Sequence, residues 1–597
     1  MKDFGKYVLA TIVGIFVTFI IGAVLMLMSI VGLVASGEAT KTVEDNSVLV
    51  LNLNGVVEEQ QTSSLLSMIS GGQVGQMGLN EILSAIKKAK DNDKIKGIYI
   101  EAGAFQAGYS TALEIRRALL DFKKSKKFIV AYGDEYMQGA YYIASVADKM
   151  YMNPSGSVDI HGLGSQLMFV KDLYAKFGIK YQIIKVGKYK SATEIYSEER
   201  MSDENREQVT AFITGLWNNM TKSIGESRKI NVDSLNVYAD NLTIMMSPEE
   251  VLKAKLVDGL LYTDQVKTEV KKLLKIDEDK SISQLSISDM QNVRDAKREG
   301  EKIAVYYAFG DIVDTPLTGI ADMGNRMIVG SDMSKDLEEL MNDDDVKAVV
   351  LRVNSPGGSA YASEQIWHAV TNLKAKKPVV VSMGDYAASG GYYISCNANW
   401  IVAEPTTLTG SIGIFGVIPE ASELMRKKLG LHFDEVKTNK HTTMMASVFG
   451  MLSRPFDAEE IAMMQNYINR GYSLFRKRVA DGRKQSIDQI EKVAQGHVWL
   501  GQDALSIKLV DQLGNLDDAI AKAAKLAKTD KYYTEEYPEQ KDLMEQLLSA
   551  ASEAKGNYLD EQLRLLLGDW YMPFISMKAA TRQSPIQASM PFVINIK

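Results

Sequence analysis

The sequence predicts an α/β protein in which two tandem copies of one domain follow a single N-terminal transmembrane helix. Short β-branched runs alternate with segments of helical periodicity, which is typical of mostly parallel sheets covered by helices. Motifs of the first half recur in the second half at a nearly constant offset, and such internal repeats indicate a duplicated structural unit. One long uncharged run at the N-terminus indicates a membrane span.

The N-terminal run covers residues 7–37, and these 31 residues exceed the roughly 20 that are needed to cross a bilayer. A cleaved signal peptide would have a shorter apolar stretch of roughly 7–15 residues, although the end of the run weakly resembles a cleavage site. Lys2 and Lys6 precede the run, and only Asp3 opposes them. The positive-inside rule therefore predicts that residues 1–37 are a cytoplasmic N-terminus and a membrane anchor, with the bulk of the chain outside the cytoplasm.

Composition excludes several classes of protein. With 597 residues, 46% of them apolar and 24% charged, the chain has the balance of a multidomain globular protein. A mean hydropathy of -0.11 excludes a polytopic membrane protein. The net charge of -7 gives no bulk attraction for nucleic acid, so no nucleic-acid partner is expected. Cys396 is the single cysteine, which excludes an intrachain disulfide, and we expect neither a metal nor another cofactor.

The repeat is clearest in three pairs of matching segments. In each copy a short strand ends in Gly-Asp, and a Tyr-Tyr pair begins seven residues after that Asp; the two glycines, at 133 and 384, are 251 residues apart. These matches predict an N-terminal repeat domain at 45–275 and a C-terminal repeat domain at 303–530. They leave a linker at 276–302, which a surface helix would also explain, and a C-terminal tail at 531–597. The other two pairs have offsets of 251 and 253: Lys96-Gly-Ile-Tyr-Ile100 with Lys347-Ala-Val-Val-Leu351, and Lys255-Leu-Val-Asp258 with Lys508-Leu-Val-Asp511.

Each copy opens with a strand and continues as alternating strands and helices. Residues 362–375 have helical spacing, and Asp457 followed by Glu460 predicts the capped start of a long helix. The runs predicted as strands are 48–53, 303–307, 346–353 and 379–383.

The two copies differ at the turn after the Gly-Asp strand. The second copy reads Tyr386-Ala-Ala-Ser-Gly-Gly-Tyr-Tyr393, whereas Gln138 replaces Ser389 in the first copy. A small-residue turn from strand to helix exposes the serine hydroxyl, and the N–H groups at the helix start favour a developing oxyanion. The same serine is also explained as a helix N-cap, for which serine is a preferred residue.

A glycine-rich loop occurs together with this serine. The second copy has Asn354-Ser-Pro-Gly-Gly-Ser359 after a strand, and the aligned residues 103–107 of the first copy lack the paired glycines. Consecutive glycines permit positive φ and leave an N–H free to face a ligand. Ser-Pro-Gly-Gly alone is consistent with a simple turn, but its loss together with Ser389 favours a shared functional role.

The residues alone leave two options for the base that would activate Ser389. None of the five histidines lies in a recognisable motif, although a histidine-based triad is possible. The other option is a neutral lysine, which needs burial to lower its pKa. Lys190 of the first copy aligns with Thr442 of the second at an offset of 252, so the serine and this lysine each occur in one copy. This distribution predicts one composite active site per pair of repeats. Because most lysines are solvated, the residues alone do not decide between Lys190 and a histidine.

Three motifs carry a resemblance to a known family. In these motifs, in the anchor and in the order of the repeats, nearly the whole chain resembles the signal peptide peptidase A family in its long, duplicated form, also called protease IV. The resemblance implies two tandem domains similar in fold to Clp protease and crotonase. It departs at Ile195-Tyr196, where the family pattern has Pro-Phe. The motifs are Tyr386-Ala-Ala-Ser-Gly-Gly-Tyr-Tyr393, Thr407-Leu-Thr-Gly-Ser-Ile-Gly-Ile-Phe-Gly416 and Gly187-Lys-Tyr-Lys-Ser-Ala192.

The resemblance also implies an activity and its residues. It implies a Ser–Lys dyad peptidase that degrades cleaved signal peptides and other apolar peptides through an acyl-enzyme, with Ser389 as nucleophile and Lys190 as general base. Gly358 and the N–H of Gly390 would form the oxyanion hole, and Ser411 would position the lysine. The family further implies a homotetrameric ring in the bacterial inner membrane, with the catalytic domains on the periplasmic side.

Two other functions compete with this one. A crotonase-type acyl-CoA enzyme would share the oxyanion-hole design, but acyl-CoA is cytosolic and the predicted anchor places the repeats outside the cytoplasm. A catalytically silent membrane scaffold of the same fold would form rings without hydrolysing apolar peptides. The presence of both Ser389 and Lys190 argues against the scaffold.

Overall fold

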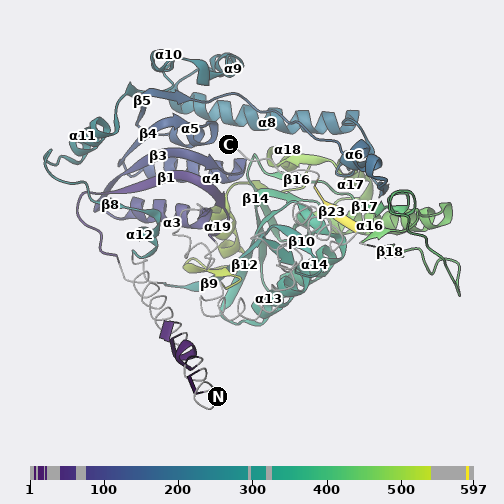
Figure 1. Cartoon of the computed structure of the whole chain (residues 1–597). Helices are drawn as coiled ribbons and strands as arrows, with labels where there is room; N and C mark the ends of the chain where they lie inside the picture. Colours follow the sequence, from purple (N-terminus) through teal and green to yellow (C-terminus); the bar gives the residue numbers. More distant parts are fainter. Residues whose placement is uncertain are drawn as a thin grey trace.

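The computed structural model describes residues 41–61, 76–293, 298–316, 326–448, 450–539 and 586–590, together with a few positions between 6 and 22. Two α/β units, one from each repeat, lie side by side (Figure 1).

The N-terminal repeat is built on a parallel sheet with strand order β2-β1-β3-β4-β5-β7, and β8 also pairs with β1. Helices α3, α4 and α5 pack on one face, and α11 covers the other. The strands are β1 (Ser47–Glu58), β2 (Gln76–Gly78), β3 (Ile95–Gln106), β4 (Phe128–Tyr136), β5 (Lys149–Val158), β7 (Gly259–Leu260) and β8 (Gln284–Leu285). The helices are α3 (Leu79–Asp91), α4 (Tyr109–Lys123), α5 (Gln138–Ala144), α9 (Val232–Asp240), α10 (Pro248–Lys253), α11 (Thr263–Leu274) and α12 (Ile287–Gln291).

The C-terminal repeat follows the same plan. Its sheet has the order β20-β16-β14-β12-β9-β22, with β15 between β14 and β21. Helices α13 to α16 pack on one face and α19 on the other, so α19 corresponds to α11. The strands are β9 (Glu301–Phe309), β12 (Val346–Ser355), β14 (Val379–Ala388), β15 (Trp400–Ala403), β16 (Leu408–Gly410), β20 (Val498–Leu500), β21 (Gln512–Leu513) and β22 (Tyr532–Tyr537). The helices are α13 (Gly330–Asn342), α14 (Ala360–Lys376), α15 (Gly390–Ser395), α16 (Ala458–Arg483), α17 (Ile487–Val493), α18 (Gly501–Ser506) and α19 (Leu516–Ala527).

A third sheet joins the repeats. Strand β6 (Lys180–Lys185) leaves the N-terminal repeat and pairs antiparallel with β17 (Phe415–Glu420) of the C-terminal repeat over six residue pairs. Helices α6 (Lys171–Phe177) and α7 (Glu194–Ser197) flank this crossing. The same sheet contains β10 (Asp311–Val313), β11 (Met327–Val329), β13 (Gly357–Ser359), β18 (Ser447–Val448), β19 (Met451–Leu452) and β23 (Ile586–Ser589).

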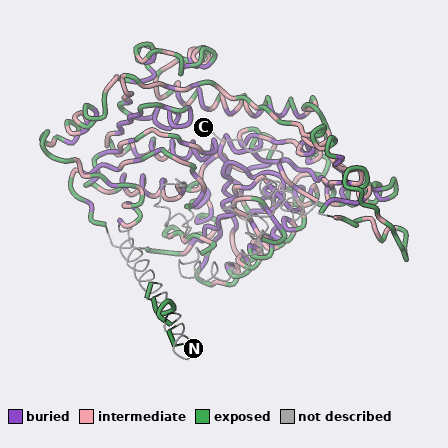
Figure 2. The backbone as a smooth tube through the Cα atoms, in the orientation of Figure 1, coloured by how far each residue is buried: buried purple, intermediate pink, exposed green. Residues whose placement is uncertain are grey.

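Helix α8 (Asp203–Arg228) lies along both repeats (Figure 1). Phe212 and Leu216 of this helix belong to one apolar core that also contains Leu408, Val498 and Leu500 of the C-terminal repeat. The buried backbone accordingly runs without interruption through the sheets of both units, while the outlying helices and loops are exposed (Figure 2). The two repeats therefore form one packed body.

Several predicted elements are confirmed. The strands predicted at 48–53, 346–353 and 379–383 lie within β1, β12 and β14, and the helix predicted at 362–375 lies within α14. Asp457 is the N-cap of α16 and forms a capping box with Glu460.

Two predicted boundaries need correction. The linker at 276–302 is partly built into the N-terminal repeat, because β8 pairs with β1 and α12 packs on α3. The tail at 531–597 contributes strands to the C-terminal repeat, because β22 pairs with β9 and β23 pairs with β13 and β17. Backbone pairing therefore extends each unit beyond the last sequence match.

Most of the predicted anchor at 7–37 lies outside the described residues. The described positions 13–18 are helical and exposed, and they project away from the packed body (Figure 1). No helix among the residues that the structure describes is long and apolar enough to cross a membrane.

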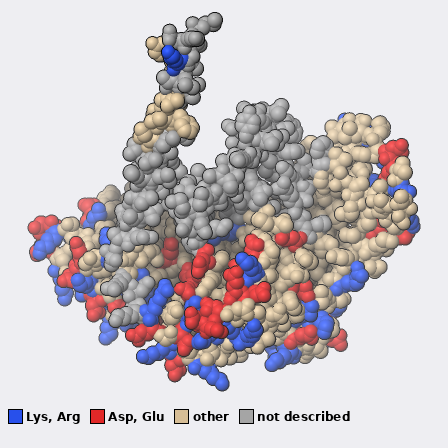
Figure 3. Space-filling model, turned by 90° about the horizontal axis from the view of Figure 1, so that it is seen from below, with Lys and Arg blue, Asp and Glu red and all other residues tan. Residues whose placement is uncertain are grey.

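On the face of the body seen from below, acidic side chains intermix with basic ones (Figure 3).

Candidate active site

Ser389 lies at the junction of β14 and α15 in a strained conformation. Its φ is 55° and its ψ is -111°, a combination that residues other than glycine rarely adopt. Its N–H donates to the carbonyl of Gly410 at 2.8 Å, which fixes the turn against the end of β16. The side chain makes no capping hydrogen bond to α15, so a role as helix N-cap does not account for this serine.

Lys190 of the N-terminal repeat lies beside this turn. After β6 the chain turns at Gly187, whose φ is 101°, and the N–H of Tyr189 donates to the carbonyl of Gln495 at 3.0 Å. The Nζ of Lys190 then lies 2.7 Å from the Oγ of Ser389. Both residues are fully buried and belong to the same chain. The two sequence candidates, which are 199 positions apart, are thus brought together.

Ser411 completes the surroundings of the lysine. Its carbonyl oxygen and its Oγ each lie 3.0 Å from Nζ of Lys190. Ser411 also has a positive φ, of 49°, and its N–H donates to the carbonyl of His497 at 2.7 Å. A Cβ on Gly413 would lie 3.2 Å from Cδ of the lysine, and a Cβ on Gly496 would lie 2.7 Å from its Cα. The buried lysine therefore packs closely against Gly413 and Gly496, and a side chain at either glycine would crowd it.

Burial lowers the pKa of Lys190 well below its ordinary value, and desolvation is the cause. An unprotonated Nζ has one lone pair and two N–H groups. The lone pair can accept the hydroxyl proton of Ser389, while the two N–H groups donate to the two oxygens of Ser411. The geometry thus satisfies every polar group of a neutral lysine.

The glycine-rich loop approaches the start of α15. Gly357 and Gly358 have φ of 108° and 152°, and a Cβ on Gly357 would lie 2.7 Å from the backbone nitrogen of Gly390. A Cβ on Gly358 would collide with the carbonyl of Ile312. Neither position tolerates a side chain, so the backbones of the predicted loop and of Gly390 meet beside Ser389.

Strand β23 lies against these glycines. It pairs antiparallel with β13, where Ala588 is opposite Gly358, and with the start of β17. The N–H of Met590 donates to the carbonyl of Pro356 at 2.7 Å. Ala588 is fully buried, and its carbonyl oxygen lies 3.1 Å from the point that a Cβ on Gly390 would occupy. One extended strand of this chain thus fills the gap between β13 and β17, and we call this gap the groove.

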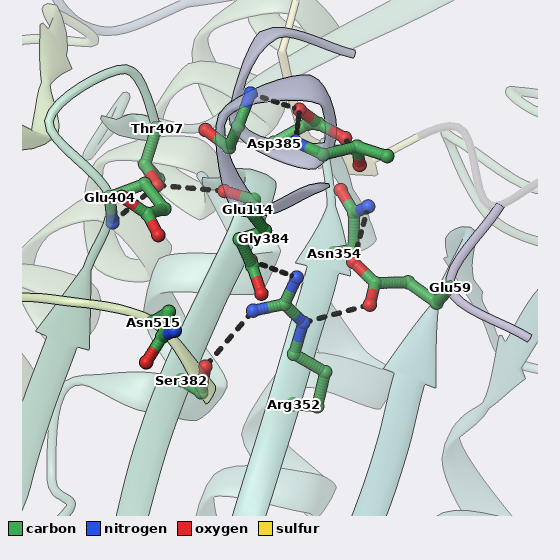
Figure 4. Close-up of polar contacts among 12 residues, drawn as sticks. Glu59, Glu114, Arg352, Asn354, Ser382, Gly384, Asp385, Glu404, Thr407 and Asn515 are labelled. Atoms are coloured by element: carbon green, nitrogen blue, oxygen red, sulfur yellow. Dashed lines mark hydrogen bonds and ion pairs between the residues drawn. The ribbon is translucent and has the colours of Figure 1, made fainter. Parts of the chain in front are cut away.

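A buried ionic network fixes the repeats against each other upstream of Ser389 (Figure 4). Arg352 of β12 is fully buried; its guanidinium donates to Glu59 at 2.8 Å and to Glu114 at 2.6 Å, and both carboxylates come from the N-terminal repeat. It also donates to Oγ of Ser382 at 3.0 Å. Burial raises the pKa of Glu114 to about 7. The sequence contained a signal for this network, since an arginine inside a continuous β-branched strand must be buried and paired.

Asp385, the aspartate of the Gly-Asp motif, belongs to the same region. Its Oδ1 accepts the N–H groups of Ser110 and Thr111 at 2.7 and 3.0 Å, so it caps the start of α4 of the other repeat. Its counterpart in the first copy, Asp134, accepts the hydroxyl of Tyr132 instead. The shared motif therefore has an inter-repeat role in the second copy.

In the first copy, Gln138 occupies the position that corresponds to Ser389. Its side-chain oxygen accepts the N–H groups of His161 and Gly162, each at 3.0 Å, and its nitrogen donates to the carbonyl of Gly162. The amide thereby holds a loop where the second copy has its serine.

The histidine option is not favoured by the geometry. All five histidines are described, and none of them has a hydrogen bond to Ser389 among the described residues. His497 contributes its carbonyl, which accepts from Ser411, while its ring stacks on Trp499.

One group of side chains in the described part of the chain has the spacing of a metal site. Ligand atoms of His441, Asp457 and Glu460 lie within 4.8 Å of one another. Arg454 donates to both oxygens of Glu460, at 2.7 and 2.8 Å, and supplies the positive charge there. This arrangement is explained as an ion-pair cluster at the start of α16.

Comparison with known proteins identifies the class of enzyme: the protein is a serine protease. The chain belongs to peptidase family S49, whose family model matches residues 121–277 and 371–530, once in each repeat. It is 35% identical to Protease 4 of Haemophilus influenzae over 530 residues, which cover 85% of this chain and 83% of that protein. It is 30% identical to the chloroplastic serine protease SPPA of Arabidopsis thaliana over 489 residues, which cover 81% of this chain and 70% of that protein. The resemblance inferred from the motifs is thereby confirmed.

Two further similarities were found. Protease 4 of Salmonella typhi is 36% identical over 536 residues, which cover 87% of this chain and 84% of that protein. Among solved structures, a ClpP1 mutant from Listeria monocytogenes matches 36% of this chain and 94% of its own, with 17% identity and a TM-score of 0.24. That score is too low to bear on the fold.

Proposed function

We propose that the protein is a membrane-anchored serine endopeptidase that uses a Ser389–Lys190 dyad to degrade cleaved signal peptides and other apolar peptides. The observation that carries this proposal is the 2.7 Å separation of Nζ and Oγ in a fully buried pair. A lysine kept neutral by burial is an established way to activate a hydroxyl nucleophile.

The mechanism follows from these positions. Lys190 accepts the hydroxyl proton as Oγ of Ser389 attacks the peptide carbonyl, and the protonated lysine then donates to the leaving amine. The N–H of Gly390 and the N–H of Gly358 stabilise the oxyanion; loss of one such donor typically costs about 10²–10³ in rate. Water then hydrolyses the acyl-enzyme. Ser411 keeps Nζ aimed at Oγ.

The groove between β13 and β17 supports an extended, apolar substrate. Strand β23 fills it by antiparallel pairing on both sides, and a substrate strand would bind there in the same mode. Ala588 and Met590 are buried, whereas Ser589 between them is half-buried. Small and apolar side chains at alternate positions are what signal-peptide remnants offer.

Location and assembly belong to the same proposal. The uncharged run at 7–37 supports a single-pass anchor in the bacterial inner membrane, with both repeats on the periplasmic side. A homotetrameric ring is proposed from the family resemblance. Proximity to the membrane would bring the groove to apolar peptides released there.

Hydrolysis of an apolar fluorogenic peptide by purified wild type, Ser389→Ala and Lys190→Ala tests the proposal. We expect both variants to lose activity while they keep the assembly state of the wild type. Gln138→Ala, at the corresponding position of the first repeat, is the matched control and should remain active. A wild type that is inert on a broad panel of apolar peptides would instead favour the catalytically silent scaffold.

A further inference from the structure

Gln208, in the second turn of α8, is a fully buried side chain that none of the steps above uses. Its Nε2 donates to the carbonyl of Tyr189 at 3.0 Å and to Oγ of Ser191 at 3.1 Å. Its Oε1 accepts the N–H of Val498 at 3.2 Å. The first two partners flank Lys190 in the chain, and the third lies in β20 of the other repeat.

The chemistry of the partners fixes the orientation of this amide. A backbone carbonyl can only accept and a backbone N–H can only donate, so Nε2 must face Tyr189 and Oε1 must face Val498. A carboxylate at position 208 would have no proton for the Tyr189 carbonyl, and an apolar side chain would leave both backbone groups without this partner.

Val498, the third partner of Gln208, lies next to the backbone that contacts Ser389. Val498 is opposite Gly410 in the β16–β20 pair, and Gly410 accepts the N–H of Ser389. The preceding residue, His497, accepts the N–H of Ser411, whose two oxygens hold Nζ of the lysine. The side chain of Gln208 therefore connects the segment that carries Lys190 with the backbone that contacts Ser389 and Ser411.

A second contact fixes the lysine-bearing segment to the same helix. Glu194, four residues after the lysine, accepts from Oγ of Ser202 at 2.6 Å and from Nδ2 of Asn205 at 3.0 Å. Glu194 and Asn205 are buried. The start of α8 thus holds this segment at two points, and Gln208 is the point next to Lys190.

We propose that Gln208 is a positioning residue for the general base, and this inference rests on the proposed Ser389–Lys190 dyad. Its neutral amide sets the separation between the Lys190 backbone and the β16–β20 pair. Because it carries no charge, it does so without favouring the protonated lysine.

The test compares Gln208→Leu and Gln208→Glu with wild type in steady-state hydrolysis of an apolar fluorogenic peptide across a pH series. In Gln208→Leu we expect kcat to fall by about 10²-fold, the cost of a small misplacement of a catalytic group, with KM within about twofold of wild type. In Gln208→Glu a buried negative charge near the lysine favours its protonated form. The acidic limb of kcat/KM should therefore move to higher pH by about one unit.

Asn219→Leu is the matched control, because Asn219 lies on the same helix and also contacts the C-terminal repeat, through Gln502 at 3.1 Å, away from the lysine. A structural role alone predicts similar losses of thermal stability in all three variants and an unmoved pH profile. The inference is overturned if Gln208→Leu retains kcat, or if the acidic limb of Gln208→Glu coincides with that of wild type. Activity that survives Ser389→Ala or Lys190→Ala would contradict the dyad itself, whatever the Gln208 variants do.

Discussion

Replacing Lys190 by methionine should stabilise the fold while abolishing hydrolysis. In the folded chain the amine is buried and its pKa is held well below the ordinary lysine value, whereas the unfolded chain exposes it to water. Between the two pKa values the unfolded state binds one more proton than the folded state. The contribution of Lys190 to the wild-type free energy of unfolding therefore rises with pH, by about 1.4 kcal/mol per pH unit for one proton. Methionine has similar length and no proton to exchange.

The magnitude follows from the linkage. For a lysine that stays neutral in the folded chain from pH 7 to pH 9, the stability advantage of Lys190→Met over wild type should shrink by about 2.7 kcal/mol across these two units. The variant loses the contacts of Nζ with Ser411, but that loss changes the stability difference between variant and wild type by the same amount at pH 7 and at pH 9. The pH dependence of the difference is thus a cleaner quantity than the difference at one pH.

Denaturant unfolding of wild type and Lys190→Met at pH 7, 8 and 9 measures this quantity. Lys188→Met, at an exposed position two residues upstream, controls for the general effect of removing a lysine and should run parallel to wild type. Parallel stability curves for wild type and Lys190→Met would refute the reasoning, because they would mean that the buried amine is charged in the folded protein.

Three further predictions concern the surroundings of the dyad. Arg352→Met leaves two buried carboxylates without their partner and should cost about 3–5 kcal/mol of stability, measured by denaturant unfolding; an unchanged midpoint would contradict the network. Ser411→Ala removes one of the two oxygens that hold Nζ and should lower kcat about tenfold with little change in KM, measured by steady-state hydrolysis. Ala588→Asp places a charge in a fully buried position, should displace β23 and should lower KM for apolar peptides, whereas a raised KM would mean that β23 does not lie in the substrate groove.

The sequence allowed the α/β fold and the candidate nucleophile Ser389 to be predicted because both depend on local patterns, whereas the choice of Lys190 as its base came from the family resemblance. Such local patterns involve residues that are close together in the chain. They include the β-branched runs, the capping box at Asp457 and the duplicated Gly-Asp motif. The strand-to-helix turn at Ser389 is equally local. The contrast between the copies made Lys190 one of two options for the base. Its burial and its contact with Ser389 depend on the pairing of β6 with β17, which no local pattern shows.

The remaining parts of the site depend on contacts between distant segments. Strand β23 is short and separated from the rest of its sheet, so no periodicity distinguishes it. Gln208 looks like an ordinary polar residue of an amphipathic helix. Its proposed role depends on its contacts with Tyr189 and Val498, which are distant in the sequence. Arg352 did have a sequence signal, because a charge inside an apolar strand requires a buried partner, but the partners are 238 and 293 positions away.

The central claim is that Ser389 is acylated with Lys190 as its base. The most direct measurement is mass-spectrometric identification of the residue modified by a serine-reactive acylating probe, with its rate followed against pH in wild type and Lys190→Met. The account predicts modification of Ser389, a wild-type rate that rises as the lysine loses its proton, and at least about 10²-fold slower labelling in Lys190→Met. Labelling of a different residue, or labelling of Ser389 at an unchanged rate in Lys190→Met, would contradict it.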